Sequence, residues 1–394
     1  MSVFAAVVTD KGTGAISTVQ VFGDRAGAVI KKIFKSTETK PAKFKTGKIL
    51  LGTICDGTET IDQVIIGCEG PHSFAINCHG NPLIVEMIMQ LLQRRGATLL
   101  TAEQLLYKIL SAQKSVNTIT LEAKLTQPAA RTIEGTKIIA NQIDAGLSKK
   151  IAEWLENINA LSLKQITADA ERILENSRTA KLIIQGCTAV IAGPPNTGKS
   201  TLLNYLAGRQ KAIVTDIKGT TRDWVSARCQ IGPLSIELID TAGLDEKLAA
   251  APNNTIRKKT QQKTAQILEE ADLVLLVLDN STSNSQLNDQ VLEKITDKLV
   301  LTVLNKSDLP AGFDTSKLPK NLSNAIQISA KFGTGIENLT ERIQQLCGIT
   351  DFDLQTPVVF TSRQEKLLQQ LKNAKSKRQA ASIVTELLNG QLRV

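Results

Sequence analysis

The sequence predicts a multidomain α/β protein, and three observations lead to that expectation. The chain has 394 residues, of which 42% are hydrophobic, enough for two or three domains with cores of their own. Short apolar runs of strand length fill the first hundred residues and return after residue 187. Apolar residues at helical spacing dominate from about residue 102 to 181 and again over 363–388.

This pattern divides the chain into three domains. We expect a small α+β domain at residues 1–110 and a helical domain formed by 111–186 together with 350–394. The remaining segment, 187–349, is then a domain inserted between the two halves of the helical domain.

In the first domain the apolar runs predict strands at 15–22, 48–54, 63–67 and 75–78. One helix is predicted over 82–95, because Pro82 suits a first helical turn and Gly96 suits a helix stop.

Composition narrows the class of protein. No apolar run approaches the roughly 18 residues that span a bilayer, and the N-terminal residues do not read as a secretory signal, so we expect a cytoplasmic protein without a membrane part. The six cysteines lack C-x-x-C spacing, which is typical of reduced, buried thiols. The nearby group Cys68, His72, Cys78 and His79 matches no zinc spacing.

The net charge of +9 is unevenly distributed. The segment 187–348 carries 18 basic and 17 acidic residues, so the surplus lies outside it. Seven lysines fall between residues 31 and 48 against one acidic residue, Glu38, and a second basic group lies at 372–378. Such clusters suit the phosphate backbone of an RNA or an ordinary solvated surface, and the sequence leaves both open.

Residues 193–200 read Gly-Pro-Pro-Asn-Thr-Gly-Lys-Ser, a complete phosphate-binding loop. The loop lies between a strand-length apolar run, 187–192, and a helical pattern that begins at Thr201. Backbone N–H groups in such a loop point at phosphate oxygens, with the positive end of the next helix behind them. We expect Lys199 to neutralise the β and γ phosphates and Ser200 to hold Mg²⁺.

Four further motifs follow in order: Thr220-Thr221, Asp240-Thr241-Ala242-Gly243, Asn305-Lys306-Ser307-Asp308 and Ser329-Ala330-Lys331. The Asp308 carboxylate can accept from the N1–H and 2-amino groups of guanine, a donor pair that adenine lacks, and Lys306 can pack along the base. The predicted ligand is therefore GTP or GDP, and the predicted activity is hydrolysis of GTP.

The predicted site covers all five motifs. Catalytic contacts are expected from Lys199, Thr221 and Gly243. The nucleotide-binding residues are expected to be Asn196, Thr197, Gly198, Lys199, Ser200, Thr201, Thr215, Asp216, Ile217, Lys218, Gly219, Thr220, Thr221, Asp240, Thr241, Ala242, Gly243, Asn305, Lys306, Asp308, Ser329, Ala330 and Lys331.

The layout and the motifs together resemble the tRNA-modification GTPase family called MnmE or TrmE. The resemblance covers essentially the whole chain and is closest at 196–204 and 212–223, with similar short stretches at 14–16, 52–54, 71–73 and 78–80. It implies a Ras-like P-loop GTPase domain inserted in a helical bundle, behind an N-terminal domain that binds 5-formyltetrahydrofolate and dimerises. It also implies a homodimer that acts with a flavoprotein on the wobble uridine (U34) of certain tRNAs.

The resemblance also implies two metal sites. Asn196 and backbone groups of Thr215, Ile217 and Thr220 would bind K⁺, and Ser200 and Thr221 would bind Mg²⁺. The fixed charge of K⁺ would replace the arginine finger that other GTPases take from a partner.

The sequence departs from the family pattern in ways that bear on chemistry. Leu244 stands where many GTPases have a water-orienting Gln, and only Asp245 and Glu246 offer carboxylates nearby, so slow hydrolysis is expected. Gln20 replaces an Arg, and the chain stops at Val394 without the family's C-terminal Cys-x-Gly-Lys motif. Two charged anchors for the folate carboxylates are thus missing, although Lys114 is a candidate for another folate contact. The alternative function is a nucleotide-switched scaffold GTPase that binds RNA or the ribosome without folate chemistry.

Overall fold

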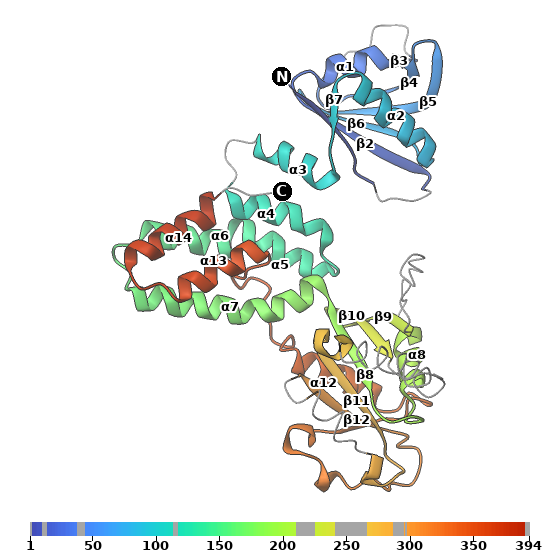
Figure 1. The fold of residues 1–394 in the computed structure, drawn as a ribbon, viewed down its shortest axis with the longest axis vertical. Helices are drawn as coiled ribbons and strands as arrows, with labels where there is room; N and C mark the ends of the chain where they lie inside the picture. The colour runs from blue at the N-terminus through green and yellow to red at the C-terminus, as the bar shows by residue number, and fades with distance from the viewer. Residues whose placement is uncertain are drawn as a thin grey trace, which may run out of the picture. The chain divides into compact units, whose positions relative to one another are not determined.

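The computed structural model describes residues 2–9, 14–37, 44–112, 117–209, 225–240, 266–286, 295 and 298–390 (Figure 1). The chain divides into two compact units, Met1–Leu121 with Gly390–Val394, and Glu122–Asn389. In its described residues each unit contains one β-sheet.

The first unit is a mixed sheet packed on two helices. In the described residues the sheet has seven strands in the order β3-β4-β5-β6-β2-β1-β7, and all neighbours are antiparallel except β1 and β7. The core forms where α1 and α2 lay buried side chains such as Ile30 and Ile88 on the sheet. The bounds are β1 (Val3–Val7), β2 (Ile16–Phe22), α1 (Ala26–Ile33), β3 (Phe34–Ser36), β4 (Ile49–Asp56), β5 (Glu59–Gly70), β6 (Ser73–His79), α2 (Pro82–Arg94), β7 (Ala97–Leu99) and α3 (Ala102–Ser111).

The four strands predicted in this region are present as β2, β4, β5 and β6, and the predicted helix is α2. Asn81 caps α2 by accepting from Leu83 N at 2.9 Å, and Gly96 follows its end with φ 93°. The sequence pattern does not predict α1, β1, β3 or β7. Strands β3 and β7 have three residues each, and the eight residues of α1 form only about two helical turns, so their periodic patterns are too short to recognise.

Helices dominate the start and the end of the second unit. The helix α4 (Thr118–Thr126) crosses the boundary between the units, and α5 (Ile133–Asp144), α6 (Leu147–Glu156) and α7 (Leu163–Gln185) follow it. After the second sheet come α13 (Ser362–Lys372) and α14 (Lys377–Asn389). Helix α13 packs against α7, and α14 packs against α6 and α13, so helices from both sides of the insertion lie together.

A buried carboxylate joins the two helical segments. Glu122, 4% exposed, accepts from Arg363 Nε and Nη2 at 2.8 Å each, from Gln364 Nε2 at 2.7 Å and from Thr361 Oγ1 at 2.8 Å. Arg363 also donates to the carbonyls at the end of α14, at 3.0 Å and 3.1 Å. Since every partner of Glu122 in this network lies more than 200 residues later in the chain, the network holds the two segments in register.

The second sheet has, in its described residues, six strands in the order β13-β12-β11-β8-β10-β9. All neighbours are parallel except β10 and β9. Strand β11 is buried at every residue, as expected for a central strand of a parallel sheet. The bounds are β8 (Cys187–Ala192), α8 (Lys199–Arg209), β9 (Val225–Ile231), β10 (Leu234–Asp240), β11 (Leu273–Asp279), β12 (Val300–Asn305), β13 (Ile326–Gln327) and α12 (Ile336–Leu346). Short 3-10 turns are η1 (Gln127–Ala129), η2 (Asn284–Gln286), η3 (Thr315–Lys317) and η4 (Lys320–Leu322).

The carboxyl ends of these parallel strands bring the predicted motifs to one edge. The phosphate loop follows β8, Asp240 ends β10, and Asn305 ends β12. The crevice outside the carboxyl ends of a parallel sheet is where ligands of α/β proteins bind.

Candidate nucleotide site

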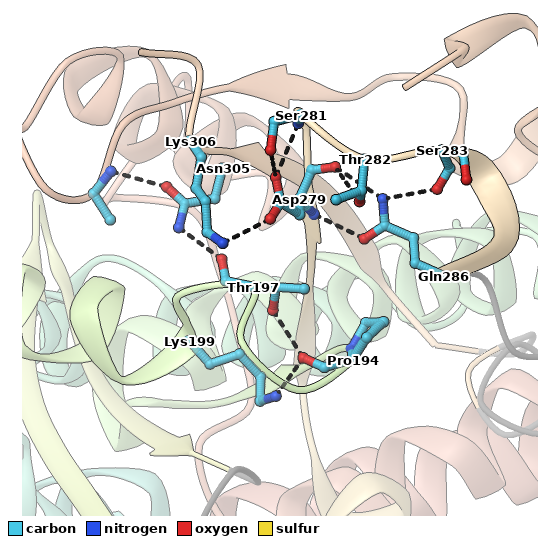
Figure 2. Close-up of polar contacts among 11 residues, drawn as sticks. Pro194, Thr197, Lys199, Asp279, Ser281, Thr282, Ser283, Gln286, Asn305 and Lys306 are labelled. Atoms are coloured by element: carbon cyan, nitrogen blue, oxygen red, sulfur yellow. Dashed lines mark hydrogen bonds and ion pairs between the residues drawn. The ribbon is translucent and has the colours of Figure 1, made fainter. Parts of the chain in front are cut away.

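The phosphate loop closes around its own lysine. Lys199 is 3% exposed, and its Nζ donates to the carbonyls of Gly193 and Pro194 at 2.8 Å each. Thr197 Oγ1 donates to the same Pro194 carbonyl at 3.0 Å (Figure 2). The ammonium therefore lies inside the loop, where a phosphate group would need positive charge.

Backbone conformation explains the residue types in the loop. Gly193 has φ 143°, and a Cβ there would collide with the Val277 carbonyl oxygen. Gly198 has φ 91°, and a Cβ there would collide with Asn305 Nδ2. Asn196 is left-handed as well, with φ 62°, a conformation that Asn tolerates better than most residues. The loop thus has the close approaches and turns that a phosphate cradle needs, and the residues present fit a nucleotide.

Ser200, whose hydroxyl is expected to bind Mg²⁺, contacts a buried carboxylate. Ser200, on the first turn of α8, donates from Oγ to Asp240 Oδ2 at 2.5 Å. Asp240 is 3% exposed at the end of β10, and Thr201 follows Ser200 at an exposed position. Mg²⁺ prefers oxygen ligands of this kind, so these residues fit that ion.

Asn305 links the two halves of the site. Its Nδ2 donates to Thr197 O in the phosphate loop at 2.8 Å, and its Oδ1 accepts from Ala330 N at 2.9 Å. Asn305 is 3% exposed. Its amide therefore fixes the phosphate loop relative to the Ser329-Ala330-Lys331 loop, a role that the motif itself does not predict.

The base-recognition residues lie on neighbouring loops. Ser329 Oγ donates to Asp308 Oδ1 at 2.6 Å, which orients the carboxylate expected to bind guanine. Lys306 is left-handed, with φ 64°, and Lys331 Nζ lies 5.1 Å from the centroid of the Phe332 ring.

Asp279 is a site residue that the sequence motifs did not identify. It ends β11 at the same edge as Asn305 and lies 2.6 Å from Lys306 Nζ. Burial would raise the pKa of Asp279, but hydrogen bonds from Lys306 and Ser281 hold the pKa below its usual value. The signal that could have found it is an acid directly after a fully apolar strand run, in the same place as Asp240 on its own strand.

Other predicted site residues lie outside the described part of the chain, namely Thr215, Asp216, Ile217, Lys218, Gly219, Thr220, Thr221, Thr241, Ala242 and Gly243. Leu244, Asp245, Glu246 and Lys114 lie outside it too.

Gln20 stands where the family pattern has an Arg that would anchor folate, and its side chain is engaged by polar neighbours. Gln20 is 7% exposed, and its Nε2 donates to Glu69 Oε2 at 2.6 Å and to Ser73 Oγ at 2.9 Å. A folate carboxylate brought to this point would meet the Glu69 carboxylate, so these residues do not fit that anchor.

The remaining sequence candidates have structural explanations. All six cysteines are free and buried, as expected, and burial raises the pKa of Cys229 to about 11. The described residues contain no group of three or more His, Cys, Asp or Glu side chains placed to bind a metal. No helix among them is long and apolar enough to span a membrane.

A mostly parallel sheet with a lysine-bearing phosphate loop and a guanine-type base motif at one edge defines a P-loop GTPase. Residues 188–306 match the family model described as 50S ribosome-binding GTPase, and residues 3–104 match that of the GTP-binding protein TrmE N-terminus.

Three relatives are each called tRNA modification GTPase MnmE. The protein of Clostridioides difficile (strain 630) is 29% identical over 397 residues, with 92% of this chain and 85% of the relative covered. That of Streptococcus mutans serotype c is 32% identical, covering 86% and 80%, and that of Lacticaseibacillus paracasei is 30% identical, covering 93% and 86%. The chain belongs to the MnmE family of tRNA modification GTPases.

Proposed function

We propose that this protein couples GTP hydrolysis to the modification of tRNA in the cytoplasm, with Mg²⁺ and K⁺ as its ions. The single observation that carries the nucleotide part is the Asn305 amide, which hydrogen-bonds to the phosphate loop on one side and to the Ala330 loop on the other. A ligand that spans both loops has a phosphate chain at one end and a base at the other.

Each described residue then has a role. Lys199 and the backbone N–H groups of the loop donate to the β and γ phosphates, and the N-terminus of α8 adds its positive dipole. Ser200 and Asp240 would hold Mg²⁺ together with Thr221, and the ion would supply positive charge for the phosphate oxygens. Asp308, oriented by Ser329, accepts from guanine.

The test of the nucleotide assignment compares bases. Adenine leaves the Asp308 carboxylate unpaired, so ATP and ADP should bind roughly 100-fold or more weakly than GTP and GDP. Lys199→Ala should abolish measurable GTP binding, whereas Lys320→Ala, which removes an exposed lysine of the same sheet domain, should not. Equal affinity for guanine and adenine nucleotides would disprove the proposal.

The potassium proposal rests on the family pattern at Asn196, Thr215, Ile217 and Thr220. A cation fixed beside the phosphates stabilises the charge of the transition state, so K⁺ should raise GTP turnover roughly tenfold or more over Na⁺ at equal ionic strength. Equal turnover in the two salts would remove K⁺ from the mechanism.

Binding of tRNA, a homodimer and a flavoprotein partner are proposed on family membership. The exposed lysines Lys31, Lys32, Lys35, Lys45 and Lys48 of the first unit support an RNA-facing surface. None of them forms an ion pair with an acidic side chain of the described residues.

One observation favours the alternative, a scaffold GTPase that binds RNA or the ribosome without folate chemistry. Gln20 is committed to Glu69 and Ser73, and no cation of the described residues takes the place of the expected Arg. Calorimetric titration with 5-formyltetrahydrofolate separates the two: heat of binding supports the modification chemistry, and its absence supports the scaffold.

A further inference from the structure

The side chain of Asp279 contacts Lys306, the lysine expected to pack along the guanine base. The Asp279 side chain is 10% exposed, and its Oδ2 lies 2.6 Å from Lys306 Nζ. Its Oδ1 accepts from Ser281 N at 2.9 Å and from Ser281 Oγ at 2.6 Å (Figure 2). Both carboxylate oxygens are therefore engaged, one by a cation and one by two neutral donors.

The backbone N–H and carbonyl of Asp279 are both hydrogen-bonded as well. Gln286 accepts from Asp279 N at 2.9 Å and donates to Asp279 O at 2.8 Å, so one side-chain amide pairs with both backbone groups. Thr282 Oγ1 donates to the same carbonyl at 3.3 Å. A carboxylate fixed in this way cannot follow the lysine if the lysine moves, so it acts as an anchor.

Lys306 is in the left-handed region of the backbone at φ 64°, which residues other than Gly, Asn and Asp rarely adopt, so the surrounding structure must hold it there. Asp279 lies directly opposite Asn305 in the register of β11 and β12, and Asn280 N donates to Asn305 O at 2.8 Å. Residues 279–280 thus contact residues 305–306 through both a backbone bond and an ion pair.

We propose that Asp279 is a positioning residue for guanine recognition, which holds the Lys306 ammonium so that the methylene chain of Lys306 packs along the base beside Asp308. This inference rests on the proposed nucleotide site. Asp279 itself touches no part of the nucleotide and acts only through Lys306.

The central variant is Asp279→Asn. It keeps the size of the side chain but replaces the charged carboxylate that faces Lys306 by a neutral amide. Losing a charge-assisted hydrogen bond of this kind should raise the dissociation constants of GDP and GTP by roughly 10- to 100-fold, seen as faster release of a fluorescent guanine nucleotide. The matched control is Asp314→Asn. Asp314 accepts from Ser316 N at 3.1 Å and Ser316 Oγ at 2.6 Å and lies 3.7 Å from Lys317, but its side chain is 48% exposed and belongs to none of the nucleotide motifs. The control should leave nucleotide affinity unchanged.

Two readouts separate positioning from a general structural role. Inorganic tripolyphosphate has no base, so its competition for the phosphate loop should change less than about twofold in Asp279→Asn. In a Lys306→Met background, which keeps the packing stem but removes the ammonium, Asp279→Asn should also change GDP affinity less than about twofold, because the two residues act as one unit.

The inference fails if Asp279→Asn releases guanine nucleotides at the wild-type rate, if it weakens tripolyphosphate equally, or if its effect persists in full beside Lys306→Met. Should Asp279→Asn not fold, Ser281→Ala removes only one donor to Oδ1 and should give a smaller rise in the same direction. Failure of the wild-type protein to prefer guanine would instead overturn the proposed function, which keeps the two failures distinct.

Discussion

Gly198 and Asn305 meet where the phosphate loop approaches the end of β12. Residue 198 has φ 91°, and the space a Cβ would need is taken by the Asn305 amide nitrogen that donates to Thr197 O. A side chain at position 198 would therefore disturb the one amide that joins the two halves of the site.

The expected consequence can be measured with Gly198→Ala. Strain at positive φ and displacement of Asn305 should weaken GDP binding by about 1–3 kcal/mol, or roughly 5- to 150-fold, measured by calorimetry. Gly208→Ala is the control, since Gly208 lies in α8 and a Cβ at that position would meet no neighbouring atom within 4 Å. The control should bind normally and gain up to about 1 kcal/mol of stability. Normal GDP binding by Gly198→Ala would mean that the loop accommodates a methyl group.

Asp279 also predicts a pH dependence. Its folded-state pKa is lowered, while an unfolded Asp titrates near 3.9. A depressed pKa contributes stability above the unfolded value, and that contribution is lost as pH falls through the lowered folded value. The difference in unfolding free energy between wild type and Asp279→Asn should therefore stay constant from pH 7 to about 5 and shrink below about 4. Urea titrations at several pH values measure it, and a difference that grows on acidification would contradict the assignment.

At the scale of elements, the helical part of the second unit is built from one chain segment that precedes the second sheet in the sequence and one that follows it. Glu122 of α4 and Arg363 of α13 form the central contact, with Gln364 and Thr361 completing the hydrogen bonds of the carboxylate. An exposed pair between α7 and α13, Glu171 and Lys372 at 2.6 Å, joins the same two segments of the chain without burial.

The buried pair Glu122–Arg363 and the exposed pair Glu171–Lys372 should contribute differently to stability. Glu122→Ala leaves Arg363 without its buried partner and should lower the free energy of unfolding by about 3–5 kcal/mol. Glu171→Ala removes a pair whose side chains are 49% and 43% exposed and should cost less than about 1 kcal/mol. Urea unfolding followed by tryptophan fluorescence measures both, since Trp154 is buried in α6. Equal effects would show that the Glu122 network is not a main source of stability.

At the scale of the whole molecule, charge separates the parts of the chain. The segment 187–348 has 18 basic and 17 acidic residues, although the chain as a whole is +9. In the first unit Lys31 and Lys32 lie on the last turn of α1 and Lys35 on β3, all exposed. Lys31 Nζ lies 5.8 Å from the Phe44 ring, which places the turn that carries Lys45 beside α1.

If these lysines contact RNA phosphates, they contribute to the salt dependence of tRNA affinity. Replacing Lys31, Lys35 and Lys45 together by Glu should weaken tRNA binding and flatten the slope of log affinity against log salt by at least about 2. The control replaces Lys164, Lys320 and Lys366, exposed lysines of the second unit, by Glu, which changes net charge equally. An identical slope for both variants would assign the lysines to an ordinary solvated surface.

The amino-acid sequence alone was sufficient to identify the nucleotide motifs and to predict most of the longer helices and strands. Gly193, Gly198, Lys199 and Ser200 identify the phosphate loop because the residue types that its turns require lie within eight consecutive residues. The longer strands of the first unit and helix α2 show their periodicity within single runs. The short elements α1, β1, β3 and β7 do not.

Only the tertiary structure assigned Asn305, Asp279, Gln20 and Glu122 their partners. Asn305 reaches Thr197 across 108 residues, and Glu122 reaches Arg363 across 241. Such contacts depend on which strands become neighbours in the sheet and which helices pack together, and residue spacing along the chain carries no information about that adjacency. Local turn chemistry therefore identifies the ligand class, whereas the order of β8, β11 and β12 determines which side chains hold its binding residues in place.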